Sequence, residues 1–533
     1  MRRSPSPRIS LGLIALVAFV AGCGSNPATT PPASPSPSVS AFPTDMAPLP
    51  TPEPTPVPTP RTVTAIVPVA DFRTTATTID QTGITAILAG KNKQFSSLEL
   101  VTGDADAILS ALSLTQSSAG THLVLAPTID ALSKDMDSAA GRLGLVRASQ
   151  VGASVRALGW GGKSLFGVDR VKSLADWPLN ATFTTEVPSS AAAFDPTQTW
   201  TVAAAGDVML DRGVYAVIKT KGLGPDYPFD GGTAAITSRY CCSPAPRSWV
   251  MPRSKRLDTT QDVRNFLTGA DLAMVNLEGP APVKSTYHAG GMSFTFNQAY
   301  LVGLKNAGID VVSLANNHIG NAGRQGMRET MAALDKIGIA HGGVGVNAAA
   351  ARAPVLFTVD GVKVAFMAYD AIAPGYAAGP NLVGTAELSK GSPADDIRAA
   401  KAAGAQVVIV YPHWGIEYRT TPTSAQKSWA HKMIDAGADI IIGNHPHYAE
   451  AMEVYKGKPI WYALGNFVFD QTWSEQTEEG LTLELSFNGP TLVQAWMHPT
   501  LDLNSSQPNF LDIASGKYVL DQVYNASKGL NSW

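Results

Sequence analysis

Polar residues that can bind metal ions follow five apolar stretches between residues 200 and 450 of this 533-residue chain. In chain order, the stretches lead into Asp207, into Asn276 and Glu278, into Asn316, Asn317 and His318, into His413, and into His445 and His447. Neutral imidazole and carboxylate groups suit zinc, manganese or iron. Two such ions side by side lower the pKa of bound water and hold phosphoryl oxygens, so the chemistry indicated is metal-assisted hydrolysis.

Each of these residues also has a simpler explanation. A histidine after a strand often belongs to a turn or to the core, and Asp or Asn there often caps the next helix. Four of the nine histidines, however, fall at such strand ends, where helix capping gives histidine no role. The set as a whole therefore favours a shared metal site, with an uncoordinated histidine as proton donor.

The helices and strands expected around these residues predict a layered α/β fold. Four times a helical stretch ends near glycine or alanine and leads into an apolar run, at residues 266–278, 304–318, 400–414 and 433–447. Helices are expected at residues 324–338 and from the capping residue Ser424 onward. Ligands of open α/β sheets gather at the carboxyl ends of strands, so distant residues can converge there.

The first 60 residues predict an exported, lipid-anchored protein. Residues 1–22 read as a signal peptide, with arginines before an apolar run that ends in a lipobox-like "VAGC". Lipid is expected on Cys23, at the extracytoplasmic face of the cell membrane; an ordinary signal peptide with a chance cysteine is the alternative. Residues 23–60 form a proline-rich linker, with 13 prolines after the cysteine.

Residues 61–195 read as a smaller α/β accessory domain, which loosely resembles part of an extracellular solute-binding domain. A plain packing or partner-docking module is the alternative. A net charge of -3 and the lack of basic runs interleaved with aromatics speak against nucleic-acid binding. Cys241 and Cys242 are adjacent and could form a vicinal disulfide, pair with other molecules, or stay as thiols.

The motifs "GDVMLDRG", "VNLEGP", "LKNAGIDVVSLANNH", "YPHWGIEY" and "GNHPHYAEAMEVYKGKPIWYALGNFVFD" resemble the CapA family of bacterial poly-γ-glutamate capsule synthesis proteins. That family is similar to the calcineurin-like metallophosphoesterases. The resemblance covers about residues 200 to 475. It implies an α/β fold, a four-layer α-β-β-α sandwich over residues 196–503, after the smaller domain. Runs 480–487 and 491–499 are expected to finish the second sheet, and residues 504–533 to form a peripheral tail.

The resemblance also implies roles for single residues. A first divalent ion would take Asp207, the bridging Glu278 and His447, and a second would take Glu278, Asn317, His413 and His445. His318 resembles the general acid. Arg212, Asn316 and Glu417 match recurrent family residues and are candidates for substrate binding. The expected cofactors are two divalent ions of Mn, Fe or Zn.

Two positions depart from the family's pattern. Met209 stands where metallophosphoesterases have a histidine ligand, and a thioether binds hard divalent ions poorly, so the first ion would be weakly held. Asn321 stands where relatives commonly have an aspartate, so His318 would lose a carboxylate that could orient it or raise its pKa.

The function implied is that of a surface-anchored protein in the synthesis and export of poly-γ-glutamate or another envelope polymer, with a phosphoesterase-like metal site. The alternative is a non-catalytic component that binds or assembles the polymer through a vestigial site. Whether the protein turns over a substrate stays open at this point. The partners expected are an anionic polymer or phosphoester, the membrane, and other membrane proteins of capsule synthesis.

Overall fold

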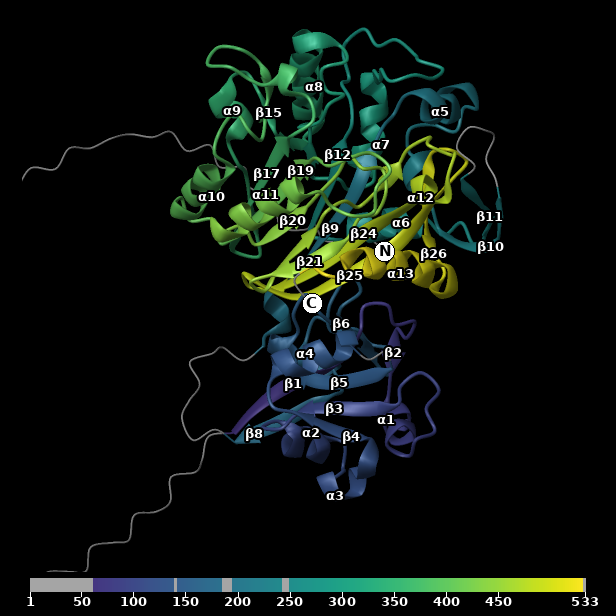
Figure 1. Ribbon diagram of the computed structural model, residues 1–533, viewed down its shortest axis with the longest axis vertical. Helices are drawn as coiled ribbons and strands as arrows, with labels where there is room; N and C mark the ends of the chain where they lie inside the picture. The colour runs from purple at the N-terminus through teal and green to yellow at the C-terminus, as the bar shows by residue number, and fades with distance from the viewer. Residues whose placement is uncertain (1–60, 139–140, 185–193, 242–248, 531–533) are drawn as a thin grey trace, which may run out of the picture.

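The computed structural model describes residues 61–138, 141–184, 194–241 and 249–530, which form a smaller and a larger body joined end to end (Figure 1). The predictions for the signal peptide, for Cys23, for the linker to residue 60 and for Cys242 concern residues outside these ranges. Among the described residues, no helix combines the length and apolar character needed to cross a membrane. Cys241 takes part in a disulfide bond, but its partner is not among the described residues.

The smaller body, residues 61–184, is an α/β domain as expected. Its sheet has the strand order β4-β3-β5-β1-β6, and β8 also pairs with β1. The strands are β1 (Arg61–Ala70), β3 (Ser97–Val101), β4 (Leu123–Ala126), β5 (Arg142–Arg147), β6 (Arg156–Ala157) and β8 (Asn180–Thr184), with a separate pair β2 (Thr78–Ile79) and β7 (Gly159–Trp160). The helices are α1 (Gln81–Leu88), α2 (Ala105–Ala111), α3 (Gln116–Ala119) and α4 (Ile129–Ser138). Buried residues such as Ile66, Leu98 and Leu132 give this body its own core.

The larger body contains two large sheets. In the first, a ten-stranded sheet, β9 (Thr199–Val208) lies between β24 and β12. Its other strands are β10 (Thr233–Cys241), β11 (Val250–Arg256), β12 (Leu272–Leu277), β13 (Val311–Ser313), β14 (Ala340–Gly342), β23 (Asn466–Val468), β24 (Glu479–Asn488), β25 (Thr491–Leu503) and β26 (Gln507–Leu511). Strands β12, β13 and β14 run parallel to β9, so their carboxyl ends share one edge.

The second sheet has the order β16-β17-β19-β20-β22-β21. Its strands are β16 (Val355–Val359), β17 (Val362–Asp370), β19 (Val407–His413), β20 (Ile440–Ile442), β21 (Met452–Tyr455) and β22 (Lys458–Trp461). The four central strands from β17 to β22 are parallel. A small pair, β15 (Val344–Gly345) with β18 (Gly384–Thr385), lies apart from both sheets.

The larger body is the four-layer α-β-β-α sandwich that was predicted. Successive residues of β9 point to opposite faces, so Val202 and Ala204 join the core between the sheets while Ala203 and Ala205 face the outer helices. The first sheet is covered by α6 (Asp262–Gly269), α7 (Leu301–Asn306) and α8 (Gly323–Ile337), and the second by α10 (Pro393–Ala402) and α11 (Ser424–Asp435). Short helices α5 (Arg212–Tyr215), α9 (Ala348–Arg352) and α12 (Glu475–Glu478) complete the layers.

Two expectations about the C-terminal part were wrong. Strands β24 and β25 do not finish the second sheet, because β24 pairs with β9 in the ten-stranded sheet. Residues 504–530 are not a peripheral tail. They form β26, which pairs with β25, and α13 (Ile513–Ser527), which buries Val519, Leu520 and Val523 in the core between the sheets.

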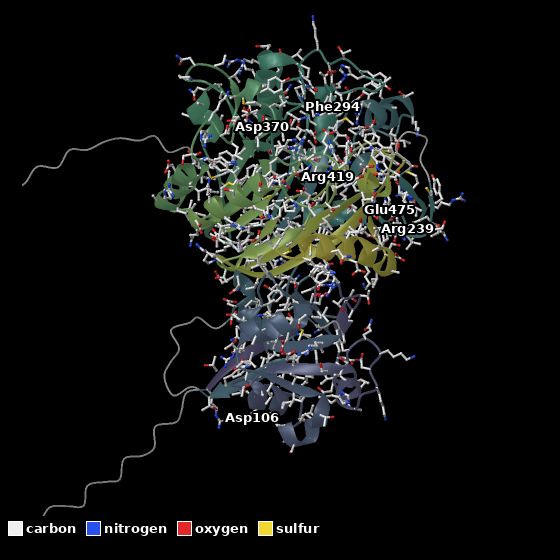
Figure 2. The ribbon with its side chains drawn as sticks, viewed as in Figure 1. Asp106, Arg239, Phe294, Asp370, Arg419 and Glu475 are labelled. Atoms are coloured by element: carbon white, nitrogen blue, oxygen red, sulfur yellow. The ribbon has the colours of Figure 1, made fainter. Side chains whose placement is uncertain are left out.

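Arg239 links three elements of the larger body through an ion pair and a cation–π contact. Arg239 of β10 lies 2.6 Å from Glu475 of α12, and both are labelled in Figure 2. The Arg239 guanidinium also lies 3.8 Å from the ring centre of Tyr518 on α13. These long-range contacts help to fix where α12 and α13 pack against β10.

Candidate metal centre

The strand ends bring the predicted ligands together. Asp207 lies near the end of β9 and is level with Asn276 of the neighbouring parallel strand β12. Glu278 directly follows β12, and His413 ends β19 in the facing sheet. The two sheets therefore deliver ligands to one point from both sides of the core.

Asp207, Glu278 and His447 form the tightest group. Each offers one ligand atom, and these atoms lie within 4.8 Å of one another. His447 Nδ1 is 3.6 Å from Asp207 Oδ2, and its Nε2 is 3.9 Å from Glu278 Oε1. Among the described residues, this is the one group of at least three His, Cys, Asp or Glu side chains with such spacing. The set predicted for a first ion is thus assembled.

Three of the four side chains predicted for a second ion, Asn317, His413 and His445, lie side by side, whereas Glu278 does not group with the two histidines at the ligand spacing of the first set. His413 Nε2 lies 2.8 Å from Asn317 Oδ1, and the rings of His413 and His445 have centroids 4.9 Å apart. His445 and His447 both adopt left-handed backbone conformations, with φ of 98° and 58°. Such conformations are unfavourable for residues other than glycine and cluster at functional sites. The loop after β20 thus holds both imidazoles in place at the expense of local strain.

The donor set fits a divalent cation. Glu278 is fully buried, and neither of its carboxylate oxygens has a hydrogen-bond partner; Nδ1 of His445 is likewise buried and unpartnered. A buried carboxylate is strongly unfavourable unless it is paired, hydrogen-bonded or bound to a metal. Imidazole and carboxylate ligands together match Zn, Mn or Fe better than Ca or Mg.

Burial sets the protonation of these groups in the metal-free protein. It raises the pKa of Asp207 to about 7, against hydrogen bonds from Asn276 and the His445 N–H. Burial and the Asp207 charge hold the pKa of Glu278 well above its usual value. Burial lowers the pKa of His445 to about 3 and holds the pKa values of His413 and His447 well below normal. Neutral imidazoles keep a free lone pair, which metal binding requires.

Asparagines orient the ligands. Asn276 Nδ2 donates to Asp207 Oδ1 at 2.8 Å and lies 3.3 Å from His413 Nδ1. Asn316 is fully buried, donates to Asn276 Oδ1 and accepts from the backbone N–H groups of His318 and Ile319. These contacts place Asn316 in the support of the site. These hydrogen bonds all lie within the protein, and the contact of Asn316 with substrate stays a prediction.

Asn466 is a site residue that sequence reasoning missed. Its Oδ1 lies 2.9 Å from His447 Nδ1, while its Nδ2 donates to the carbonyl of Thr477. Since the oxygen only accepts, Nδ1 of His447 carries the hydrogen, and Nε2 turns its lone pair toward Glu278. The signal in the sequence was the "GNF" after another apolar run, the same pattern that marked the other strand ends.

His318 is anchored although the usual aspartate is replaced. Its Nδ1 lies 3.1 Å from Asn321 Oδ1, which also accepts from the N–H of Phe294. The Phe294 ring, labelled in Figure 2, packs against the imidazole with centroids 4.1 Å apart. His318 Nε2 faces Glu278 Oε1 at 3.7 Å. Burial lowers the pKa of His318 to about 4, against the hydrogen bond to Asn321, which raises it.

Arg212 and Glu417 lie close to the centre in different ways. Arg212 is buried, forms a short ion pair with Asp470 and donates to the Gly291 carbonyl at 2.9 Å. These bonds hold its guanidinium within the protein, and contact with substrate stays a prediction. Glu417 is half-buried, and its charge contributes to the raised pKa of Glu278.

Met209 does not act as a ligand in this arrangement. It is fully buried, and its sulfur accepts a hydrogen bond from the Asp211 N–H at 3.0 Å. The first ion would therefore be bound by three protein ligands.

Gly206, one residue before Asp207, lets the chain before β23 approach β9 closely, because a Cβ there would lie 1.9 Å from the Gly465 carbonyl oxygen.

Comparison with known proteins shows that the residues of this centre lie in a stretch of the chain that matches a protein family. Residues 201–471 match the family described as "Bacterial capsule synthesis protein PGA_cap". The chain is 33% identical over 240 residues to "Capsule biosynthesis protein CapA" of Bacillus anthracis, covering 43% of this chain and 58% of that protein. It is 34% identical over 225 residues to "PGA biosynthesis protein CapA" of Bacillus subtilis, covering 42% and 59%. The matches thus span less than two thirds of these two relatives.

A third relative and two solved structures also align with parts of the chain. A protein of Mycobacterium tuberculosis named "Probable polyglutamine synthesis accessory protein" is 30% identical over 287 residues, or 51% of this chain and 74% of that one. The calcineurin-like phosphoesterase YfkN of Bacillus subtilis aligns with TM-score 0.33 and 14% identity, over 61% of this chain and 97% of that chain. A 5'-nucleotidase precursor of Thermus thermophilus aligns with TM-score 0.32 and 13% identity, over 61% and 58%.

Proposed function

Because the chain belongs to the bacterial capsule synthesis protein PGA_cap family, we propose that it takes part in making or exporting an anionic capsule polymer such as poly-γ-glutamate. The buried cluster of Asp207, Glu278 and His447 carries the proposal, since it lies within the matched span and fits a divalent cation. The names of the relatives, which refer to capsule, PGA and polyglutamine synthesis, support the same polymer class.

The proposed cofactor is a pair of divalent ions of Mn, Fe or Zn. Asp207, Glu278 and His447 would hold the first, and Glu278, Asn317, His413 and His445 the second. When bound, such ions supply charge for phosphoryl oxygens and lower the pKa of water. Asn276 and Asn466 fix the orientation of Asp207 and His447, so the ligands are positioned before an ion arrives.

His318 is proposed to move a proton at Nε2. Its Nδ1 is committed to Asn321, so Nε2 is the nitrogen that faces Glu278 and the centre. The Phe294 ring on one face limits water around the imidazole and keeps its plane constant. Because Asn321 Oδ1 only accepts, Nδ1 carries the hydrogen of the neutral ring, and Nε2 would first take up a proton from water before giving it to a leaving alkoxide.

The experiment joins metal analysis with polymer output. The purified full-length chain is expected to contain Mn, Fe or Zn by elemental analysis and to hydrolyse a member of a panel of phosphomonoesters and phosphodiesters. A strain carrying Asp207→Ala with His445→Ala should secrete at least tenfold less polymer while keeping normal protein levels, because both ion positions lose a ligand. Unchanged secretion would falsify a role for the centre.

A second candidate function is a non-catalytic component that binds or assembles the polymer. The hydrogen bond from the Asp211 N–H to the Met209 sulfur favours this non-catalytic function, because only three protein ligands remain for the first ion. The two functions separate in the same experiment. Lost secretion together with hydrolysis of a panel phosphoester by the wild-type chain supports the enzyme, whereas lost secretion without any hydrolysis supports the binding component.

The protein is further proposed to sit at the extracytoplasmic face of the membrane, through lipid on Cys23 and the proline-rich linker. The lipobox-like "VAGC" and the composition of residues 24–60 support this. In a Cys23→Ala strain, most of the protein should move from the membrane fraction to the soluble extracytoplasmic fraction. Retention of Cys23→Ala in membranes at the wild-type level contradicts the anchor.

A further inference from the structure

The two bodies of the chain are docked through specific contacts. The N–H of Gly167 donates to Ser486 Oγ at 2.9 Å, and the N–H of Val168 donates to Glu484 Oε1 at 2.7 Å. Phe72 of the smaller body is buried in the core of the larger one. Figure 1 shows β6 of the smaller body directly below β25 of the larger. The junction is thus a packed interface.

A cavity of about 90 Å³ lies in this junction. The smaller body contributes Arg73, Thr74, Thr77 and Arg156 to its wall. The larger body contributes residues of β25, from Trp496 to Pro499, and the first turn of α13 with Lys517. The volume exceeds the roughly 10–15 Å³ that a single water needs. None of the wall residues belongs to the metal centre.

Arg156 on β6 is the unusual member of this wall. Its side chain is 5% exposed, and among the described residues the Thr74 carbonyl, 2.8 Å from Nη1, is its one hydrogen-bond partner. The Nε atom is buried without a partner. The guanidinium lies 4.1 Å from the ring centre of Trp496, which supplies an apolar face but no counter-charge.

Nearby carboxylates are already engaged. Glu484 acts on Arg156 only at a distance, because its oxygens accept from the Val168 N–H and from His498 at 3.1 Å. Asp71 holds the Arg73 guanidinium through two bonds of 2.7 and 3.0 Å. Burial lowers the pKa of Arg156 to about 10, so it stays charged at neutral pH. A buried charge without a paired counter-charge is strongly unfavourable.

The free edge of Arg156 has a defined shape. In a guanidinium, the N–H bonds of Nε and Nη2 are parallel, and this edge binds two oxygens of a carboxylate or phosphate at once. Since Nη1 is used by Thr74, this two-donor edge is the one left for a ligand. On the opposite wall Lys517 is paired with Asp521 at 2.5 Å, and Asp512 caps the N-terminal turn of α13, so the charge available to a ligand is that of Arg156.

We propose that the cavity binds one small oxyanion, a carboxylate or phosphate group, on the Nε and Nη2 edge of Arg156. The anion would neutralise the buried guanidinium and link the accessory domain to the sandwich. The ligand is thus identified by its chemistry, whether it is a free anion or a carboxylate carried on a polymer. This proposal does not depend on the metal centre or on the capsule function.

The test uses the full-length chain stripped of metal by a chelator that is then removed by dialysis, so that neither the metal centre nor the chelator competes for the anion. Inorganic phosphate, acetate and a short glutamate oligomer are titrated separately by calorimetry, with chloride at equal ionic strength as reference. At least one should bind saturably to wild type. Arg156→Lys should bind about tenfold more weakly or worse, because it keeps the charge but loses the paired donors. Arg156→Met should not bind.

Arg328→Met is the matched control, because Arg328 is an exposed arginine on α8 and does not line the cavity. It should bind as wild type does. Binding of phosphate or acetate alone identifies a free anion, and binding of the oligomer identifies a polymer-borne carboxylate. Arg156→Met is expected to fold, since it removes an unpaired buried charge. If no probe binds wild type beyond chloride, or if Arg156→Met binds equally well, the site does not exist.

Discussion

Glu278→Gln is expected to lose bound metal and, in chelator at pH 8, to unfold at a higher temperature than wild type. Both carboxylate oxygens of Glu278 are buried without hydrogen-bond partners, beside the buried carboxylate of Asp207. The pKa of Glu278 is held well above normal by burial and by that charge. Without metal, the wild-type side chain must either be charged in the interior or hold a proton that the unfolded chain would release.

The sign of the effect follows from linkage. A carboxyl whose pKa is raised on folding binds more protons in the native state, so the metal-free protein loses stability as pH rises above about 4.5. Glutamine does not titrate, so the metal-free variant does not lose this stability as the pH rises to 8. With metal the order reverses, because the ion stabilises the wild-type fold by mass action and the variant cannot hold it.

The measurement is thermal unfolding of both proteins in chelator and with excess Mn²⁺ or Zn²⁺, together with metal content. Glu417→Gln is the matched control, because Glu417 is half-buried, contributes charge at the same place and is not a predicted ligand. It should keep its metal. A Glu278→Gln protein that holds metal at the wild-type ratio, or that is less stable than wild type in chelator, contradicts the assignment.

The candidate ligands could be predicted from the sequence because they lie at the ends of strands or directly after them. Each of Asp207, Glu278, His413 and His445 follows an apolar run, and parallel strands bring their ends to one edge whatever their order in the chain. The ligands could therefore be predicted without knowing the order of the strands in the sheet. The family resemblance then separated ligands from the proposed acid His318, a distinction that residue type alone does not make.

The supporting contacts could not be found in this way, because they depend on register and on pairs far apart. Asp470 meets Arg212 across 258 positions, and Asn466 meets His447 only because β23 pairs with β9. The same limit explains the errors at the C-terminus. Alternation along 480–487 predicts a strand, but it does not state that the neighbour is β9 in the first sheet.

Glu450→Gln is expected to stabilise the protein increasingly as pH rises from 5 to 8. Glu450 is 1% exposed, accepts from Gln426 Nε2 at 2.7 Å through one oxygen, and has no partner for the other. Burial raises its pKa to about 8, against that hydrogen bond. Glutamine resembles the protonated acid in shape and can still accept from Gln426, so the variant should fold as wild type does.

The native state holds the Glu450 proton up to about pH 8, whereas the unfolded chain releases it near pH 4.5. Wild type therefore loses stability across this window, by on the order of 3–5 kcal/mol relative to the variant. The two proteins should differ little at pH 5, and most at pH 8. Urea unfolding at pH 5, 6, 7 and 8 gives the difference directly, and other titrating groups cancel because both proteins share them.

Glu329→Gln provides a control with the opposite sign. Hydrogen bonds from Gln325 and from the Val283 N–H lower the pKa of Glu329, so its contribution is present above pH 4.5 and is lost only in more acidic solution. Its difference from wild type should stay flat between pH 5 and 8. A flat difference for Glu450→Gln as well would mean that the Glu450 carboxyl is charged at neutral pH, and therefore that a cation or solvent reaches its free oxygen.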